Sequence, residues 1–164
     1  MAGHLGAAGG SRPDAGNHRR RSAPARRHRT VTLFLLDTNA ASDLLRRPDG
    51  RIAEHVKRVG ETNVGMSVLV SAELAFGAEQ SSSPTLVWRV ESLRRRISVL
   101  SFEQPADLHY GRLRAILKAR GLPIGPNDLL IAAHALALNA TLVTDNIREF
   151  SRVPGLAVEN WLRH

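Results

Sequence analysis

The chain has 164 residues and no cysteine, so it can form one domain with a real core, and disulfides, thiolate zinc sites and a cysteine nucleophile are excluded. The net charge is +8, but residues 1–30 carry seven arginines against one acid, which leaves only +2 for residues 31–164. No apolar run approaches the roughly 20 residues of a membrane-spanning helix, so we expect no membrane segment.

Composition separates residues 1–30 from the rest of the chain. They are dominated by Gly, Ala, Ser, Pro and Arg and lack an apolar central region, which argues against a secretory signal and predicts a disordered basic arm. Such an arm can attract nucleic acid or can be an extension without a role. Arg is abundant while Lys occurs only twice, a bias typical of GC-rich coding. We therefore hypothesise that residues 1–30 are not native and that the protein begins near Val31.

The first predicted elements lie between Val31 and Gly60. The run VTLFLLD is continuously apolar with β-branched and aromatic members, which predicts a buried parallel strand. ASDLLRRPD predicts a short helix that stops near Pro48. RIAEHVKRVG predicts a second helix, with Ile52 and Val56 at helical spacing and Gly60 as its stop.

The middle of the chain continues this alternation. NVGMSVLVSAELAFGAEQ predicts a short strand at residues 64–66 and then a helix that contains Glu73. After the loop SSSPT, TLVWRVESLRRR predicts a helix with Pro84 at its first position. ISVLSF predicts the next strand.

The last third of the chain is predicted to hold two helices and two strands. QPADLHYGRLRAILKARG predicts a long helix that ends at Gly121, and the nearly all-apolar DLLIAAHALALN predicts a buried one. ATLVT predicts a strand, and LAVENW a last, edge strand. Alternating strands and helices predict an α/β fold with a mainly parallel sheet, in which binding sites form outside the carboxyl ends of the strands.

Four acids stand out because apolar sequence surrounds or precedes them. They are Asp37, Glu73, Asp128 and Asp145. Asp37 and Asp145 each end a predicted strand, and the other two lie on predicted helices. A parallel sheet can therefore bring all four to one edge.

Each of these acids also has a structural interpretation. Asp37 or Asp128 can cap a helix or interact with its macrodipole, and Asp145 with Asn146 can form a turn. As a set, however, carboxylates repel one another and need a cation. Oxygen ligands without Cys or closely spaced His select Mg²⁺ or Mn²⁺.

Four motifs in this order, LLDTN, SAELAFG, GPNDLLIAAHA and TLVTDNIREF, resemble the PIN-domain ribonucleases, and closely the VapC toxins of bacterial toxin–antitoxin modules. The resemblance runs from about Val31 to Trp161, and residues 125–135 are its most specific part. It implies a three-layer α/β/α sandwich with a mainly parallel central sheet for residues 31–164, in agreement with the element pattern.

The resemblance also implies the site residues. By position, Asp37, Glu73 and Asp128 become catalytic acids that bind Mg²⁺, with Mn²⁺ as a substitute. Asn39 and Thr144 fall on polar positions that line the family's site.

The fourth catalytic position falls on Asp145 or Asn146. We prefer Asp145 because it carries charge. An Asn at this position could instead line the site and act through a water molecule.

The implied function is that of the toxic component of a toxin–antitoxin system, a Mg²⁺-dependent endoribonuclease that hydrolyses RNA phosphodiester bonds in the bacterial cytoplasm. Its expected partners are a small cognate antitoxin, an RNA substrate such as tRNA, and a second copy in a homodimer. Leu44, Leu45, Ile52 and Val56 can line the antitoxin groove or fill the core. The alternative is a non-cleaving PIN-fold regulator that binds nucleic acid together with its antitoxin.

Overall fold

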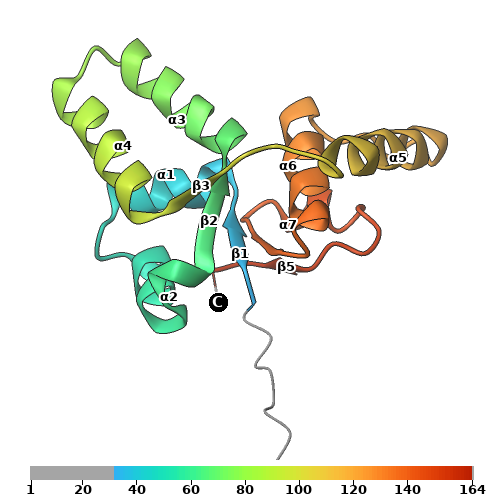
Figure 1. The fold of residues 1–164 in the computed structure, drawn as a ribbon, viewed down its shortest axis with the longest axis horizontal. Coiled ribbons are helices and arrows are strands. Elements are labelled where there is room, and N and C mark those ends of the chain that lie inside the picture. The colour runs from blue at the N-terminus through green and yellow to red at the C-terminus, as the bar shows by residue number, and fades with distance from the viewer. Residues whose placement is uncertain (1–31, 164) are drawn as a thin grey trace, which may run out of the picture.

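A five-stranded sheet forms the centre of the computed structural model, which describes residues 32–163 (Figure 1). The strand order is β3-β2-β1-β4-β5, and every neighbouring pair is parallel. The strands are β1 (Phe34–Leu36), β2 (Val64–Ser67), β3 (Ser98–Leu100), β4 (Thr141–Val143) and β5 (Val158–Glu159). The basic arm predicted at residues 1–30 lies outside the described residues.

Helices cover both faces of the sheet, which gives the expected three-layer α/β/α sandwich. In Figure 1, α1 to α4 lie on one side of the sheet and α5 to α7 on the other. Within residues 32–163, no helix is long and apolar enough to cross a bilayer. The helices are α1 (Thr38–Arg46), α2 (Arg51–Val59), α3 (Val68–Gln80), α4 (Pro84–Arg96), α5 (Ala106–Ala119), α6 (Pro126–Ala137) and α7 (Ile147–Phe150), with a 3₁₀ turn at η1 (Glu61–Asn63).

The predicted helix ends are confirmed where Gly or Pro marks them. Gly60 follows α2 with φ of +91° and Gly121 follows α5 with φ of +65°, conformations that a residue with a Cβ atom adopts only with strain. Pro84 is the first residue of α4, where its missing N–H costs no intrahelical bond. Two elements were not predicted: the single-turn helix α7 after β4 and the 3₁₀ turn η1.

Four apolar residues were expected either to line the antitoxin groove or to fill the core, and most of them lie in the core. Leu44, Ile52 and Val56 are at most 3% exposed and pack in the core, whereas Leu45 is only partly buried. Three of these four residues are therefore core residues, and Leu45 alone among them reaches the surface.

The order in which the chain adds strands to the sheet reverses between β1 and β4. The chain adds β2 and β3 on one side of β1 and β4 and β5 on the other. In parallel sheets, a crevice opens at such a switch point, outside the carboxyl ends of the two strands. Leu36 pairs with Val143 in the ladder, so Asp37 and Thr144, which follow them, lie beside one another at this point.

Candidate active site

Asp37 is a buried carboxylate at the switch point. It is 4% exposed and is the N-cap of α1, with Oδ1 accepting the backbone N–H of Ala40 at 2.7 Å. The hydroxyl of Thr144 donates to the other carboxylate oxygen. Burial raises the pKa of Asp37, and the hydrogen bonds from Thr144 and from the backbone amides of Ala40 and Asn39 oppose that rise. The residue therefore both caps a helix and presents a charge at the strand end.

Glu73 approaches the site from the middle of α3. Its side chain is half-buried, and its two carboxylate oxygens accept hydrogen bonds from the Thr38 hydroxyl and from the Asn127 amide. These two donors come from α1 and α6, so Glu73 joins three helices around the crevice. Thr38 and Asn127 were not singled out by the sequence, although each is the immediate neighbour of a predicted acid.

Asp128 lies in the first turn of α6 but does not cap it. The N-cap is Gly125, and it has no side-chain cap hydrogen bond. The pKa of Asp128 is raised from 3.8 to about 6, first by burial, then by the charge and hydrogen bond of Glu149, and then by the charges of Asp37 and Glu73. Of the three metal-binding acids expected from the sequence, Asp37 and Glu73 are therefore both close enough for their charges to act on Asp128.

Glu149 is a site residue that the sequence reasoning missed. It lies on α7, half-buried, with its carboxyl group against that of Asp128. Burial is the largest cause of the raised pKa of Asp128, and the charge and the hydrogen bond of Glu149 add to it. Glu149 lies within the motif TLVTDNIREF. Because no helix was predicted after β4, no pattern in the sequence predicted its side chain near Asp128.

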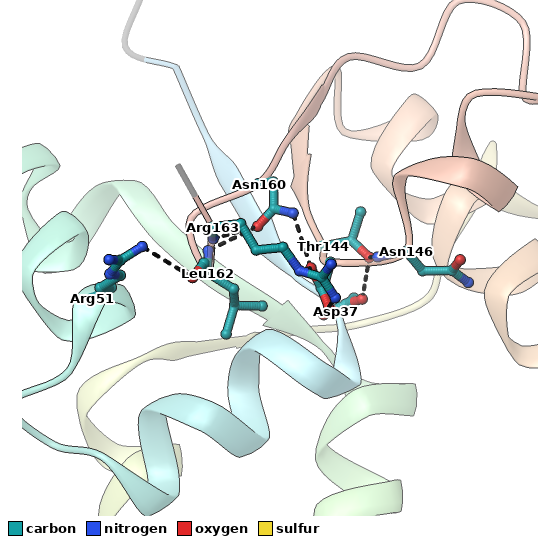
Figure 2. A network of polar contacts seen from close by, with 8 residues as sticks. Asp37, Arg51, Thr144, Asn146, Asn160, Leu162 and Arg163 are labelled. Atoms are coloured by element: carbon teal, nitrogen blue, oxygen red, sulfur yellow. Dashed lines mark hydrogen bonds and ion pairs between the residues drawn. The ribbon is translucent and has the colours of Figure 1, made fainter.

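The two neighbours Asp145 and Asn146 point to different partners. Asn146 donates from its side chain to Asp128 Oδ2 at 3.4 Å, and its backbone N–H donates to Thr144 Oγ1 at 2.9 Å. Figure 2 shows Asn146 extending away from Arg163, while Thr144, Asp37 and the Arg163 guanidinium gather at the strand ends.

Asp145 is held by the C-terminal segment. Its Oδ1 and Oδ2 lie 2.7 Å from the Nε and Nη2 atoms of Arg163, and Asn160 donates to Oδ1 at 3.0 Å. Arg163 and Asn160 lower the pKa of Asp145. The charge of Asp145 nevertheless contributes to the raised pKa of Asp37, so this acid lies near the site without turning into it.

Asn39 contributes its backbone more than its side chain. Its side chain is exposed, and its backbone N–H is directed at Asp37. Three polar residues were expected to line the site. The side chains of Thr144 and Asn146 contact the acids, whereas Asn39 contacts Asp37 through its backbone N–H.

The atoms that could bind a metal ion at this site are carboxylate and hydroxyl oxygens. Amide N–H groups donate hydrogen bonds that hold the carboxylates in place. Within residues 32–163, no group of three or more acidic or histidine side chains is already arranged to hold a metal ion. The chemistry of the set still fits a hard cation, because a divalent ion would offset the negative charges that Asp37 and Glu73 place near Asp128.

Comparisons with known proteins place this geometry in context. The family model described as PIN domain matches residues 34–156. Ribonuclease VapC2 of Rickettsia felis is 37% identical over 131 residues, which cover 79% of this chain and 98% of that protein. The tRNA(fMet)-specific endonuclease VapC of Salmonella typhimurium is 36% identical over 129 residues, covering 78% of this chain and 97% of that protein.

Solved structures agree with the sequence relatives. The VapBC2 complex of Rickettsia felis bound to a promoter DNA fragment matches with a TM-score of 0.75 and 35% identity, covering 79% of this chain and 99% of the matched chain. VapBC-1 of nontypeable Haemophilus influenzae matches with a TM-score of 0.73 and 38% identity, covering 80% and 100% of the two chains.

Proposed function

The chain belongs to the PIN-domain family, and on that premise we propose that it is the toxin of a toxin–antitoxin pair and an endoribonuclease that hydrolyses RNA phosphodiester bonds. The observation that carries this proposal is that Asp37, Glu73 and Asp128 come together at the switch point of the sheet. Thr144 donates to Asp37, Asn146 donates to Asp128, and Asn127, the neighbour of Asp128, donates to Glu73. The names of the similar proteins, ribonuclease and endonuclease VapC, support the same activity.

Asp37, Glu73 and Asp128 would hold a Mg²⁺ ion, or Mn²⁺ in its place, and such an ion supplies a polarised phosphoryl oxygen and a bound water of lowered pKa. Thr144 and the Ala40 amide orient Asp37 through its two oxygens. Supporting hydrogen bonds of this kind fix ligand geometry.

Asp128 has to lose its proton before it can bind a metal ion as a carboxylate. Because its pKa is raised to about 6, Asp128 is poised to give up or accept a proton near neutral pH. After burial, Glu149 contributes to this raised pKa through its charge and its hydrogen bond.

The contacts favour Asn146 and Glu149 over Asp145 as the direct neighbours of Asp128. Asn146 already donates to Asp128, whereas Asp145 is bonded to Arg163. We assign Asp145, the preferred fourth acid in the sequence, an electrostatic effect on Asp37 and a role in anchoring the C-terminal segment.

A surface groove marks the proposed antitoxin site. One cavity of about 300 Å³ is lined by Leu45 of α1 and Trp88 of α4, and a second of about 200 Å³ is lined by Leu45 and Glu73. Leu45 lines both, so the two hollows are neighbours, and together we call them the Trp88–Glu73 groove. Trp88 is 69% exposed, a large apolar side chain that a partner would bury.

The antitoxin would place apolar side chains on Trp88 and Leu45 and an arginine near Glu73, where its guanidinium would satisfy the carboxylates in place of a metal. The similar structures named VapBC are toxin–antitoxin complexes, which supports a partner of this kind. We further propose that the protein forms a homodimer and acts in the bacterial cytoplasm, where RNA such as tRNA is available.

The test is metal-dependent cleavage by the purified chain. Incubation with total tRNA and mixed RNA should give new 5′ ends with Mg²⁺ or Mn²⁺, none with a chelator, and none with Asp128→Asn. If wild-type protein binds RNA but leaves it intact under all metal conditions, the non-cleaving regulator is the better description.

A further inference from the structure

A second concave feature lies on the opposite side of the sheet from the antitoxin groove. Where α5 packs against α6 (Figure 1), a pocket of about 260 Å³ opens between the two helices and the loop that joins them. Its floor is apolar, made by the buried side chains of Leu117 and Leu129, and Ile124 of the loop forms one wall. We call it the α5–α6 pocket.

The rim of this pocket is aromatic and cationic. Tyr110, Arg114 and Lys118 follow one another at helical spacing on α5 and all line the opening. The guanidinium of Arg114 donates to the Tyr110 hydroxyl at 3.2 Å and lies 5.9 Å from the ring centroid. No acid is among the pocket's lining residues, so the charges on its rim favour a negatively charged ligand.

The loop wall is held in place by its own contacts. Arg152 donates to the carbonyl oxygen of Pro123 at 3.0 Å, and the backbone N–H of Leu122 donates to the Leu117 carbonyl at 3.0 Å. Gly121, with φ of +65°, makes the turn from α5 into this loop. The pocket is thus formed before any ligand enters.

The pocket and the acids share the first turn of α6. Pro126 and Leu129 line the pocket, while Asp128, between them in sequence, belongs to the acidic site. At about 100° per residue, Leu129 and Asp128 face neighbouring sides of one helical turn, so the pocket and the acidic site lie on neighbouring sides of the start of α6.

We propose that the α5–α6 pocket binds one nucleotide of unpaired RNA beside the cleaved bond. The base would contact Tyr110 and the apolar floor, and the phosphate would meet Arg114 and Lys118. Unpaired bases are recognised by stacking on aromatic and guanidinium groups, with cations along the backbone. The inference rests on the proposed ribonuclease function and adds to it a binding site for one base of the substrate.

The test measures binding separately from cleavage. In an Asp128→Asn background without divalent metal, affinity is measured by fluorescence anisotropy for a labelled oligouridylate of about eight nucleotides and for a base-free sugar–phosphate chain of the same length. Two double variants are compared, R114Q/K118Q at the pocket and R112Q/R120Q on other faces of the same helical region.

Each double variant removes two positive charges from exposed positions, so the second measures the purely electrostatic loss. We expect R114Q/K118Q to weaken oligouridylate binding about tenfold more than R112Q/R120Q. Tyr110→Leu should reduce the preference for oligouridylate over the base-free chain about fivefold, and Tyr110→Phe should retain it. Melting temperatures verify that each variant is folded.

Equal losses in the two double variants, or an unchanged base preference in Tyr110→Leu, would overturn the pocket assignment. So would a shift in sedimentation with unchanged RNA affinity, because the pocket would then be an interface between copies. Cleavage by the wild-type protein is measured in parallel. Its absence would overturn the proposed function, while the binding comparison still decides the pocket.

Discussion

At the scale of single residues, the site holds carboxyl groups that are buried although their charged forms favour water. Asp37 is almost fully buried yet has both oxygens hydrogen-bonded, which offsets part of the cost of desolvating a carboxylate. Asp128 accepts one long hydrogen bond from Asn146, at 3.4 Å, and lies beside the charge of Glu149. The two acids therefore respond differently to substitution and to pH.

Asp128→Asn should separate metal binding from folding. The substitution preserves shape and removes a charge that Glu149, Asp37 and Glu73 repel, so the metal-free protein should melt at the same temperature or up to about 3 °C higher. Metal affinity should fall by more than about 100-fold. Calorimetric melting in a chelator and Mn²⁺ titration check the two effects. Lower stability with retained metal binding would contradict the assignment of Asp128 as a ligand.

The metal-free protein should also lose stability as the pH rises toward neutrality. The pKa of Asp128 is raised from 3.8 to about 6, so in that window the folded state binds more protons than the unfolded state, and the free energy of unfolding falls as pH rises. The raised pKa of Asp37 acts in the same direction. The lowered pKa of Asp145 acts only below its ordinary value, where stability falls as pH falls.

Thermal melts in a chelator between about pH 4 and pH 7 measure this dependence. Glu149→Gln is the informative variant, because it removes the second-largest cause of the raised pKa of Asp128. The midpoint of the stability change should then move to lower pH. An unchanged midpoint in Glu149→Gln would show that Glu149 does not interact with Asp128 as described.

At the scale of elements, each helix that follows a strand brings one part of the site. α1 begins at Thr38, directly after Asp37, and α3 carries Glu73. α6 brings Asp128 from the other face of the sheet, and α7 adds Glu149. The same arrangement leaves α1 and α4 with an open groove between them.

Trp88→Ser should weaken antitoxin binding without unfolding the protein. Trp88 is 69% exposed on α4 and lines the Trp88–Glu73 groove. Burial of an interface tryptophan typically contributes about 2 kcal/mol or more, so affinity should fall at least about 30-fold. Calorimetric titration with the cognate antitoxin measures it.

Phe76→Ser is the matched control, because Phe76 is 66% exposed on α3 and is not among the residues lining the groove. It should leave antitoxin affinity within about twofold of wild type. Equal losses in both variants would place the antitoxin elsewhere on the helical face.

At the scale of the whole molecule, the described fold accounts for the site without residues 1–30. All the acids and their hydrogen-bond partners lie between Asp37 and Arg163. The C-terminal segment packs against the rest of the fold. Trp161 is buried, and its ring centroid lies 5.0 Å from those of Phe34 and His55. The basic arm is outside the described residues, so its role stays a prediction from composition.

Deletion of residues 1–30 should leave the melting temperature within about 2 °C of the full chain and metal-dependent cleavage intact. The arm carries six of the eight net positive charges, so RNA binding should weaken at low salt and converge with that of the full chain at high salt. Melting and RNA titrations at two salt concentrations check this. A large drop in melting temperature would show that the arm packs on the domain.

The sequence by itself predicted the five strands and the six longer helices, and it named Asp37, Glu73 and Asp128 as candidate site acids. Continuous apolar runs identified β1 and β4, and Gly60, Pro84 and Gly121 marked helix boundaries, because these signals depend only on neighbouring residues. Placing acids after parallel strands also predicted which edge of the sheet they share. The short helix α7 gave too few residues for a periodic signal and was missed.

Only the tertiary structure decided which polar side chains meet. Asp145 and Asn146 are adjacent in sequence, yet Asn146 turns to Asp128 and Asp145 to Arg163, 18 residues further along. Successive side chains after a strand point in different directions, and their partners come from segments whose positions depend on packing. The fourth position of the site and the contact between Asp128 and Glu149 were therefore fixed by how α6, α7 and the C-terminal segment pack around the sheet, which no local pattern records.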